Sequence, residues 1–222
     1  MKKTLTVPTS LDEVSVRQLR LYLETIQEDI TDDMKTLALF QCFLGIGKRQ
    51  YDAIKPADRT RIAAAMTDLL QAQAEFKAIF TYRGTRYGII PNLEAMTNGE
   101  YIDLDNYSKK PADIPKFLSV LYRPITKQKG DYYEIEPYQG SEKLRSIMEE
   151  VPASIYLGSQ AFFLTIGREL FNCTPKYLQA AAAESQQKRS ASLTKNGTGK
   201  ATYTHLQAGI LQNLAQLLKV IF

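Results

Sequence analysis

The side chains best suited to binding or catalysis are carboxylates in one short stretch of the chain. Glu100, Asp103 and Asp105 follow one another closely, and Glu94 lies just before them. On a helix, Asp103 would share a face with Glu100, because it lies three residues later. Carboxylate oxygens are the ligands that a hard divalent cation prefers, so a metal site is one interpretation of this cluster.

A structural interpretation of the same residues is favoured, because their spacing fits a helix cap. Thr97 and Glu100 match the capping box, in which a hydroxyl and the side chain three residues later satisfy each other's backbone amides. Asp103 then lies near the positive end of the helix dipole. Ser15 and Gln18 repeat the pattern earlier in the chain. We therefore predict two capping boxes, with neither a metal nor a cofactor.

The two caps belong to a longer motif that the sequence contains twice. Residues 7–19 and 90–101 each place a β-branched residue before a proline, then a leucine, then an apolar residue directly before the capping hydroxyl. A gap of one residue aligns the two copies. The repeat indicates shared scaffold chemistry, in which polar side chains shape the backbone.

Residue types suited to nucleophilic catalysis are scarce. His205 is the single histidine, which removes most nucleophile–base pairs and histidine metal clusters. Cys42 and Cys173 lie in apolar helical stretches, which favours buried free thiols over a disulfide. Residues 45–48 (Gly-Ile-Gly-Lys) lack the full phosphate-loop spacing and are interpreted as a helix stop. We predict no catalytic residue and no enzymatic activity.

Composition points to a globular protein with one core. The chain has 222 residues, 44% apolar and 23% charged, with a net charge of +4. The basic excess is concentrated in residues 188–200, which contain no acidic residue. This segment, with tyrosines near the predicted strands, makes nucleic-acid binding an alternative function. No apolar run approaches the ~18 residues of a membrane span, so no membrane partner is expected.

Periodicity predicts a mainly α fold with a small antiparallel β-sheet. The sheet is expected from a hairpin over 76–90 and a further strand over 131–138. Helices are expected over 16–29, 34–44, 56–73, 98–107, 113–121, 141–150 and 156–171, with a short turn of helix at 49–54 and a further helix after Pro175. Together they form a globular domain over 1–188.

The end of the chain is expected to differ from this domain. Residues 189–203 are rich in Ser, Thr, Lys, Gly and Ala, as in a flexible polar linker. Residues 204–222 then form an amphipathic helix. Its apolar stripe either docks into a groove on a partner or packs on its own domain. The stripe consists of Leu206, Ile210, Leu214, Leu217 and Leu218.

Several short segments of the sequence are distinctive as a set: residues 7–14, 87–91, 96–104, 121–124, and Phe162-Phe163 with Gly167. They resemble a family of tailed-bacteriophage morphogenesis proteins from phages of Bacteroidetes-type hosts, over roughly residues 5–180. The layout also resembles phage tail assembly chaperones, whose helical domain carries a flexible C-terminal extension. In those proteins, the extension engages the tape-measure protein and tail-tube subunits.

The resemblance implies a non-enzymatic assembly factor that acts through protein–protein contacts. A head–tail connector or another structural component of the virion is the main alternative. The implied partners are tape-measure, tail-tube or connector subunits, and a second copy of the chain is a further candidate. The expected location is the host cytoplasm during assembly, with the virion as the alternative.

Overall fold

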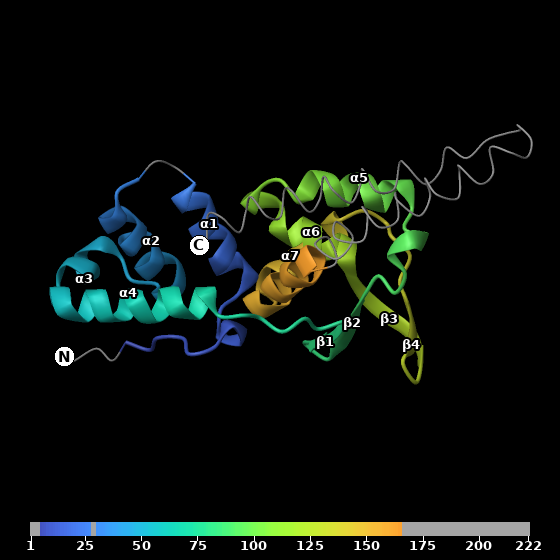
Figure 1. The fold of residues 1–222 in the computed structure, drawn as a ribbon, viewed down its shortest axis with the longest axis horizontal. Helices are drawn as coiled ribbons and strands as arrows, with labels where there is room; N and C mark the ends of the chain where they lie inside the picture. The colour runs from blue at the N-terminus through green and yellow to red at the C-terminus, as the bar shows by residue number, and fades with distance from the viewer. Residues whose placement is uncertain (1–4, 28–29, 166–222) are drawn as a thin grey trace, which may run out of the picture.

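The protein is mainly helical with one small antiparallel sheet, which confirms the predicted fold class. Its structure is a computed structural model that describes residues 5–27 and 30–165. Helices α2, α3 and α4 lie on one side of the molecule, and the sheet lies on the other with α5, α6 and α7 (Figure 1). Helix α1 lies between the two groups. Within the described ranges, no helix combines the length and apolar character needed to cross a bilayer.

The first half of the chain forms helices whose ends are fixed by caps. Their bounds are α1 Val16–Ile26, α2 Asp32–Leu44, α3 Lys48–Asp52 and α4 Pro56–Gln71. Helix α2 begins after Thr31, whose hydroxyl accepts a hydrogen bond from the backbone N–H of Met34. It ends at Gly45, which adopts a left-handed φ of 64°. The helix stop expected at residues 45–48 is therefore confirmed. Phe40 is fully buried at the centre of these helices and meets Tyr51 edge-on.

The sheet has the order β1-β2-β3-β4, with every neighbouring pair antiparallel. Its strands are β1 Ile79–Tyr82, β2 Thr85–Ile89, β3 Tyr122–Lys129 and β4 Tyr132–Ile135. Arg83 and Gly84 join β1 to β2, with positive φ values of 48° and 78° that fit a two-residue type I′ turn. The predicted hairpin is therefore present.

Strand β3 is missing from the sheet that the sequence predicts. The sequence predicts that a helix ends at residue 121, before Pro124, and it predicts no strand there. In the structure the chain enters an extended strand at Tyr122. Proline excludes helix at the residue before it but is compatible with extended backbone, so both outcomes follow from the same restraint. Pro124 lies opposite Tyr87 of β2. The sheet therefore includes residues 122–129 as well as parts of 76–90 and 131–138.

Three labelled helices accompany the sheet: α5 Asn98–Tyr107, α6 Ile114–Leu121 and α7 Glu142–Glu150. Short 3₁₀ turns precede α1, α5 and α6 at Leu11–Glu13, Leu93–Ala95 and Pro111–Asp113. Ser141 occupies the N-cap position of α7, as predicted, but its side chain does not cap the helix. The residue already has helical backbone angles, and its Oγ donates to the Tyr107 hydroxyl at 3.2 Å instead.

A further helix contributes to the core. It begins at residue 153, earlier than the predicted 156, and residues 153–160 are all buried. Gly158 allows its close approach to the chain before β1, because an added Cβ would collide with the backbone carbonyl of Glu75. The Tyr122 hydroxyl, from β3, donates to the Lys77 carbonyl at 2.8 Å and lies 2.9 Å from Ser159 Oγ. The predicted continuation to residue 171, and the helix expected after Pro175, lie outside the described residues.

Candidate functional site

The two predicted capping boxes are both present. Ser15 N–H donates to Gln18 Oε1 at 2.9 Å, and Gln18 N–H donates back to Ser15 Oγ at 3.2 Å. Thr97 N–H donates to Glu100 Oε2 at 2.7 Å, and Glu100 N–H donates to Thr97 Oγ1 at 3.3 Å. Each box follows a 3₁₀ turn. The repeated sequence motif therefore forms the same local structure twice.

The side chains that close the boxes also reach other parts of the fold. Gln18 Nε2 donates to the Phe43 carbonyl of α2 at 3.3 Å, which is a neutral contact. Glu100 Oε1 instead lies 2.6 Å from Arg123 Nη2 of β3. Both partners of this ion pair are buried, with side-chain exposures of 6% and 7%. Sequence spacing predicts that Glu100 closes a capping box. It does not predict the pairing with Arg123, because that arginine lies on β3, a strand that the sequence does not predict.

The surroundings of Glu100 keep its carboxylate charged. Burial raises the pKa of the Glu100 carboxyl. Hydrogen bonds from Thr97 and the nearby Arg123 together lower this pKa by more than burial raises it, so the net shift is downward. Asp103 accepts a hydrogen bond from the Tyr138 hydroxyl at 2.5 Å. Burial, followed by the contact with Asp103, raises the pKa of Tyr138, so this phenol stays a neutral donor. The Arg123 guanidinium lies over the Tyr138 ring at 5.7 Å.

The structure gives Glu100, Asp103 and Asp105 each a separate protein partner, whereas the side chain of Glu94 lies outside the described part. Glu100 contacts Thr97 and Arg123, Asp103 contacts Tyr138, and Asp105 lies 2.8 Å from Lys109 Nζ. Over residues 5–27 and 30–165, no group of three or more His, Cys, Asp or Glu side chains is placed to hold a metal ion. The geometry of the described carboxylates is that of helix and sheet contacts.

A second polar cluster brings the start of the chain to the helix that begins at residue 153. Ser154 Oγ donates to Asp12 Oδ1, and Lys77 Nζ lies 3.4 Å from the same oxygen. The hydrogen bond from Ser154 is the main cause of a lowered pKa at Asp12. A carboxylate with a lowered pKa is a weaker base than an ordinary aspartate. The sequence gives no signal for this contact, because its residues lie far apart in the chain.

The same cluster borders an open groove of about 310 Å³. One wall is the 3₁₀ turn at Leu11–Glu13 with the residues before it, and the other is the end of α4 with the extended chain after it. Gln73, Glu75 and Lys77 line this second wall at alternate positions. The groove is open and of mixed polarity, and Lys77, the one cation among its described lining residues, is shared with Asp12.

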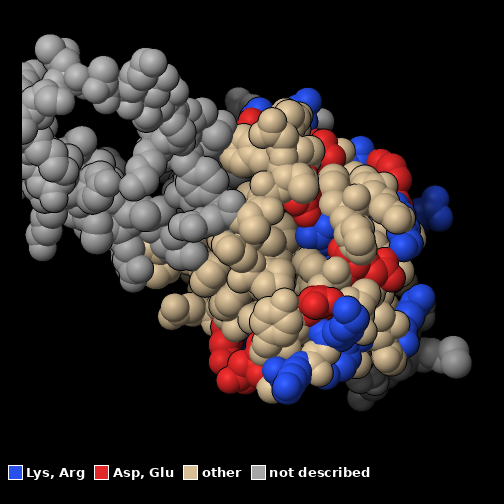
Figure 2. Space-filling model, turned by 90° about the vertical axis from the view of Figure 1, so that its right-hand side faces the viewer, with Lys and Arg blue, Asp and Glu red and all other residues tan. Residues whose placement is uncertain are grey.

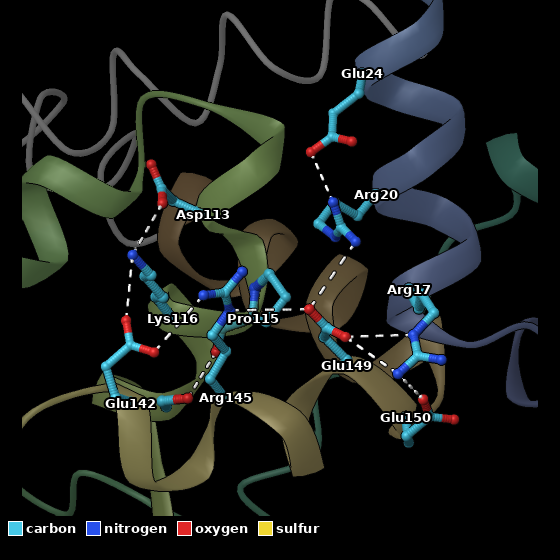
Figure 3. A network of polar contacts seen from close by, with 11 residues as sticks. Arg17, Arg20, Glu24, Asp113, Pro115, Lys116, Glu142, Arg145, Glu149 and Glu150 are labelled. Carbon is cyan, nitrogen blue, oxygen red and sulfur yellow. Dashed lines mark hydrogen bonds and ion pairs between the residues drawn. The ribbon is translucent and has the colours of Figure 1, made fainter.

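A network of charged residues ties α1 to α7 and α6 (Figure 3). Glu149 of α7 is its centre, with arginine nitrogens of Arg17 at 3.2 Å, Arg20 at 3.9 Å and Arg145 at 3.9 Å. Arg17 also lies 2.5 Å from Glu150. The network pairs acidic with basic groups, as expected of a contact between helices. Sequence reasoning misses it, since the two helices are separated by more than one hundred residues.

The remaining candidates divide into structural residues and residues beyond the described part. Cys42 is a half-buried free thiol, and burial raises its pKa, which opposes formation of the reactive thiolate. Cys173, His205, the basic residues 188–200 and the whole terminal stripe lie outside the described residues. Among the tyrosines near strands, Tyr122 and Tyr87 are buried, whereas Tyr132 is 67% exposed.

Charge on the face shown in Figure 2 is mixed. Lysine and arginine side chains are interspersed with aspartates and glutamates beside uncharged surface, without a broad field of one sign. This pattern differs from the dense basic surface typical of nucleic-acid binders. In comparisons with known proteins, no family model, no curated protein and no solved structure matches this chain.

Proposed function

We propose that this protein is a non-enzymatic assembly or structural factor of a tailed phage, acting in the manner of a tail assembly chaperone through protein–protein contacts. The observation that carries the proposal is that the described carboxylates that could take part in catalysis instead contact other residues within the fold. Glu100, Asp103 and Asp12 each contact a partner within the fold. A catalytic site instead requires such groups to converge on a position where a substrate can bind.

The proposed contact surface is the terminal apolar stripe. Leu206, Leu214 and Leu218 are central members of this stripe, which recurs at helical spacing. A flexible linker of the length of residues 189–203 gives a reach of roughly 20 Å, so the stripe would have room to meet a partner beside the domain. An amphipathic helix of this kind binds by placing its apolar face in a hydrophobic groove.

Co-expression with the tape-measure, tail-tube and connector proteins of the parent phage tests this contact. The test variant is the full chain with Leu206, Leu214 and Leu218 changed to serine. We expect it to lose co-purification with its partner while its thermal unfolding midpoint stays that of the natural chain. Retained co-purification would exclude the stripe as the contact.

A matched control separates this proposal from nucleic-acid binding. It changes Lys188, Arg189 and Lys195 to glutamine and leaves the stripe intact. We expect this control to keep the protein partner. Loss of binding in the control alone, with affinity that falls steeply as salt is added, would support the nucleic-acid alternative instead.

Mass spectrometry of purified particles beside the infected-cell lysate distinguishes the two phage roles. A chaperone is abundant in the lysate and absent from the particles. Detection in particles at a fixed ratio to the tail or portal proteins would support the head–tail connector alternative and contradict the chaperone proposal.

A further inference from the structure

Helix α5 is attached to the fold in a different way from its neighbour α6. Helix α6 buries an almost continuous apolar surface that includes Ile114, Phe117 and Leu118. In α5, Leu104 is the one apolar side chain that is fully buried, and the other buried residue is the charged Glu100. Ile102, on the same helix, is 55% exposed. Tyr101 and Tyr107 of α5 pack against the core but are only partly buried, so α5 fully buries less apolar surface than α6 does.

Polar contacts join α5 to four separate elements. The ion pair of Glu100 reaches Arg123 of β3, and Asp103 accepts from Tyr138 in the segment after β4. Tyr107 accepts a hydrogen bond from Ser141 at the start of α7, and Lys116 of α6 lies 5.4 Å from its ring. We call these contacts the polar anchor of α5.

The central cation of the polar anchor is incompletely paired. Arg123 is 6% exposed, yet its Nε atom has no hydrogen-bond partner among the residues that the structure describes. A buried donor without an acceptor loses its interaction with water and gains no replacement. When α5 moves away, water can solvate both Arg123 and Glu100, which lowers the free-energy cost of opening this ion pair.

From these contacts we propose that α5 is a latch, which detaches from the sheet as a unit while the rest of the domain stays folded. Local opening is favoured where apolar burial is small and polar contacts can be exchanged for water. The capping box moves with the helix, since Thr97 and Glu100 both belong to its first turn. The helix therefore keeps its own N-terminal cap in the open state, and the break falls at the polar anchor.

Hydrogen exchange followed by mass spectrometry, on the full chain at pH 7, tests the latch. The probes are the hydrogen-bonded amides in the last two turns of α5, compared with those of α6. We expect the α5 amides to exchange at least about tenfold faster than those of α6, through an opening that does not change with global stability. Equal protection of the two helices in the natural chain would overturn the proposal.

A variant and a matched control locate the break. Glu100→Gln removes the charge of the ion pair, and we expect it to accelerate exchange in α5 by roughly a further tenfold, with α6 unchanged. The control, Asp105→Asn, removes the exposed Lys109 pair on the same helix, and its effect should stay below about twofold. Acceleration of α5 and α6 by the same factor in Glu100→Gln would show that the helix opens only with the whole domain, and would also overturn the proposal.

Discussion

Helices α1 and α5 begin with the same motif and the same capping box, but they are fastened to the protein differently. Helix α1 buries Val16, Leu19 and Leu23, and its capping glutamine makes a neutral contact with α2. Helix α5 buries Leu104 and depends on the charged Glu100. The residue that closes the box therefore does more than cap the helix. In α1 this residue supplements a buried apolar face that holds the helix, whereas in α5 it supplies the ion pair that holds the helix.

The largest expected difference between the two regions comes from removing the cation. Arg123→Met leaves Glu100 buried without its partner, and breaking a buried pair in this way typically costs about 3–5 kcal/mol. The comparable change in the first region, Gln18→Ala, removes the neutral hydrogen bond to Phe43 and two hydrogen bonds from Ser15 within the box, with an expected loss of about 1–2 kcal/mol. Urea unfolding of both variants at pH 7 measures these losses.

The double variant Arg123→Met with Glu100→Gln serves as the control for this measurement. Because it leaves no uncompensated charge, we expect it to be more stable than Arg123→Met alone. If Arg123→Met costs no more than Gln18→Ala, the charged and neutral attachments are equivalent and the comparison fails.

Removal of the capping hydroxyls should have a smaller effect that is unequal between the two helices. Ser15→Ala and Thr97→Ala each remove a cap, for which the usual loss is about 1 kcal/mol. We expect the greater loss for Thr97→Ala, because the Thr97 hydroxyl donates to the buried Glu100 carboxylate at 2.8 Å, whereas the Ser15 hydroxyl donates to the neutral amide oxygen of Gln18 at 3.2 Å. Thr97→Ser should restore most of the stability. Equal losses for Ser15→Ala and Thr97→Ala, measured by urea unfolding, would place the whole effect in the cap.

The charged attachment should also be sensitive to acid. The pKa of Glu100 is lower in the folded protein than in the unfolded chain, so its stabilisation is present above the ordinary glutamate pKa of about 4.3. It is lost as the pH falls through the lower, folded value, because the unfolded chain then binds the additional proton.

We therefore expect the stability difference between the natural chain and Glu100→Gln to shrink as the pH falls below about 4. Asp12 also has a lowered pKa, through Ser154, so the single variant Asp12→Asn is measured alongside to separate the two contributions. A difference that stays constant from pH 7 to pH 3.5 would show that Glu100 carries no linked proton.

The sequence predicts the contacts that form within one turn of helix and misses those that depend on distant chain segments. Both caps, the stop at Gly45 and the β1–β2 hairpin follow from local backbone chemistry. The partner of Glu100 could not be predicted, because Arg123 lies on strand β3, for which the sequence pattern gives no expectation. The contact between Asp12 and Ser154 joins the two ends of the described chain, and no spacing rule connects them.

The smallest effect is expected where charges lie at the surface of α1. Arg17 pairs with Glu149 and Glu150 of α7, but its side chain is 49% exposed. Exposed pairs of this kind typically contribute 0.2–1 kcal/mol at most, so we expect about that loss for Arg17→Gln, and it should disappear in 0.5 M salt. The Arg123→Met loss should persist at the same salt concentration, because ions in solution do not screen a buried pair effectively. Urea unfolding of both variants at low and high salt therefore separates the two kinds of charge. If the two losses respond equally to salt, Glu100 and Arg123 are solvated in solution, and α5 is not held by a buried charge.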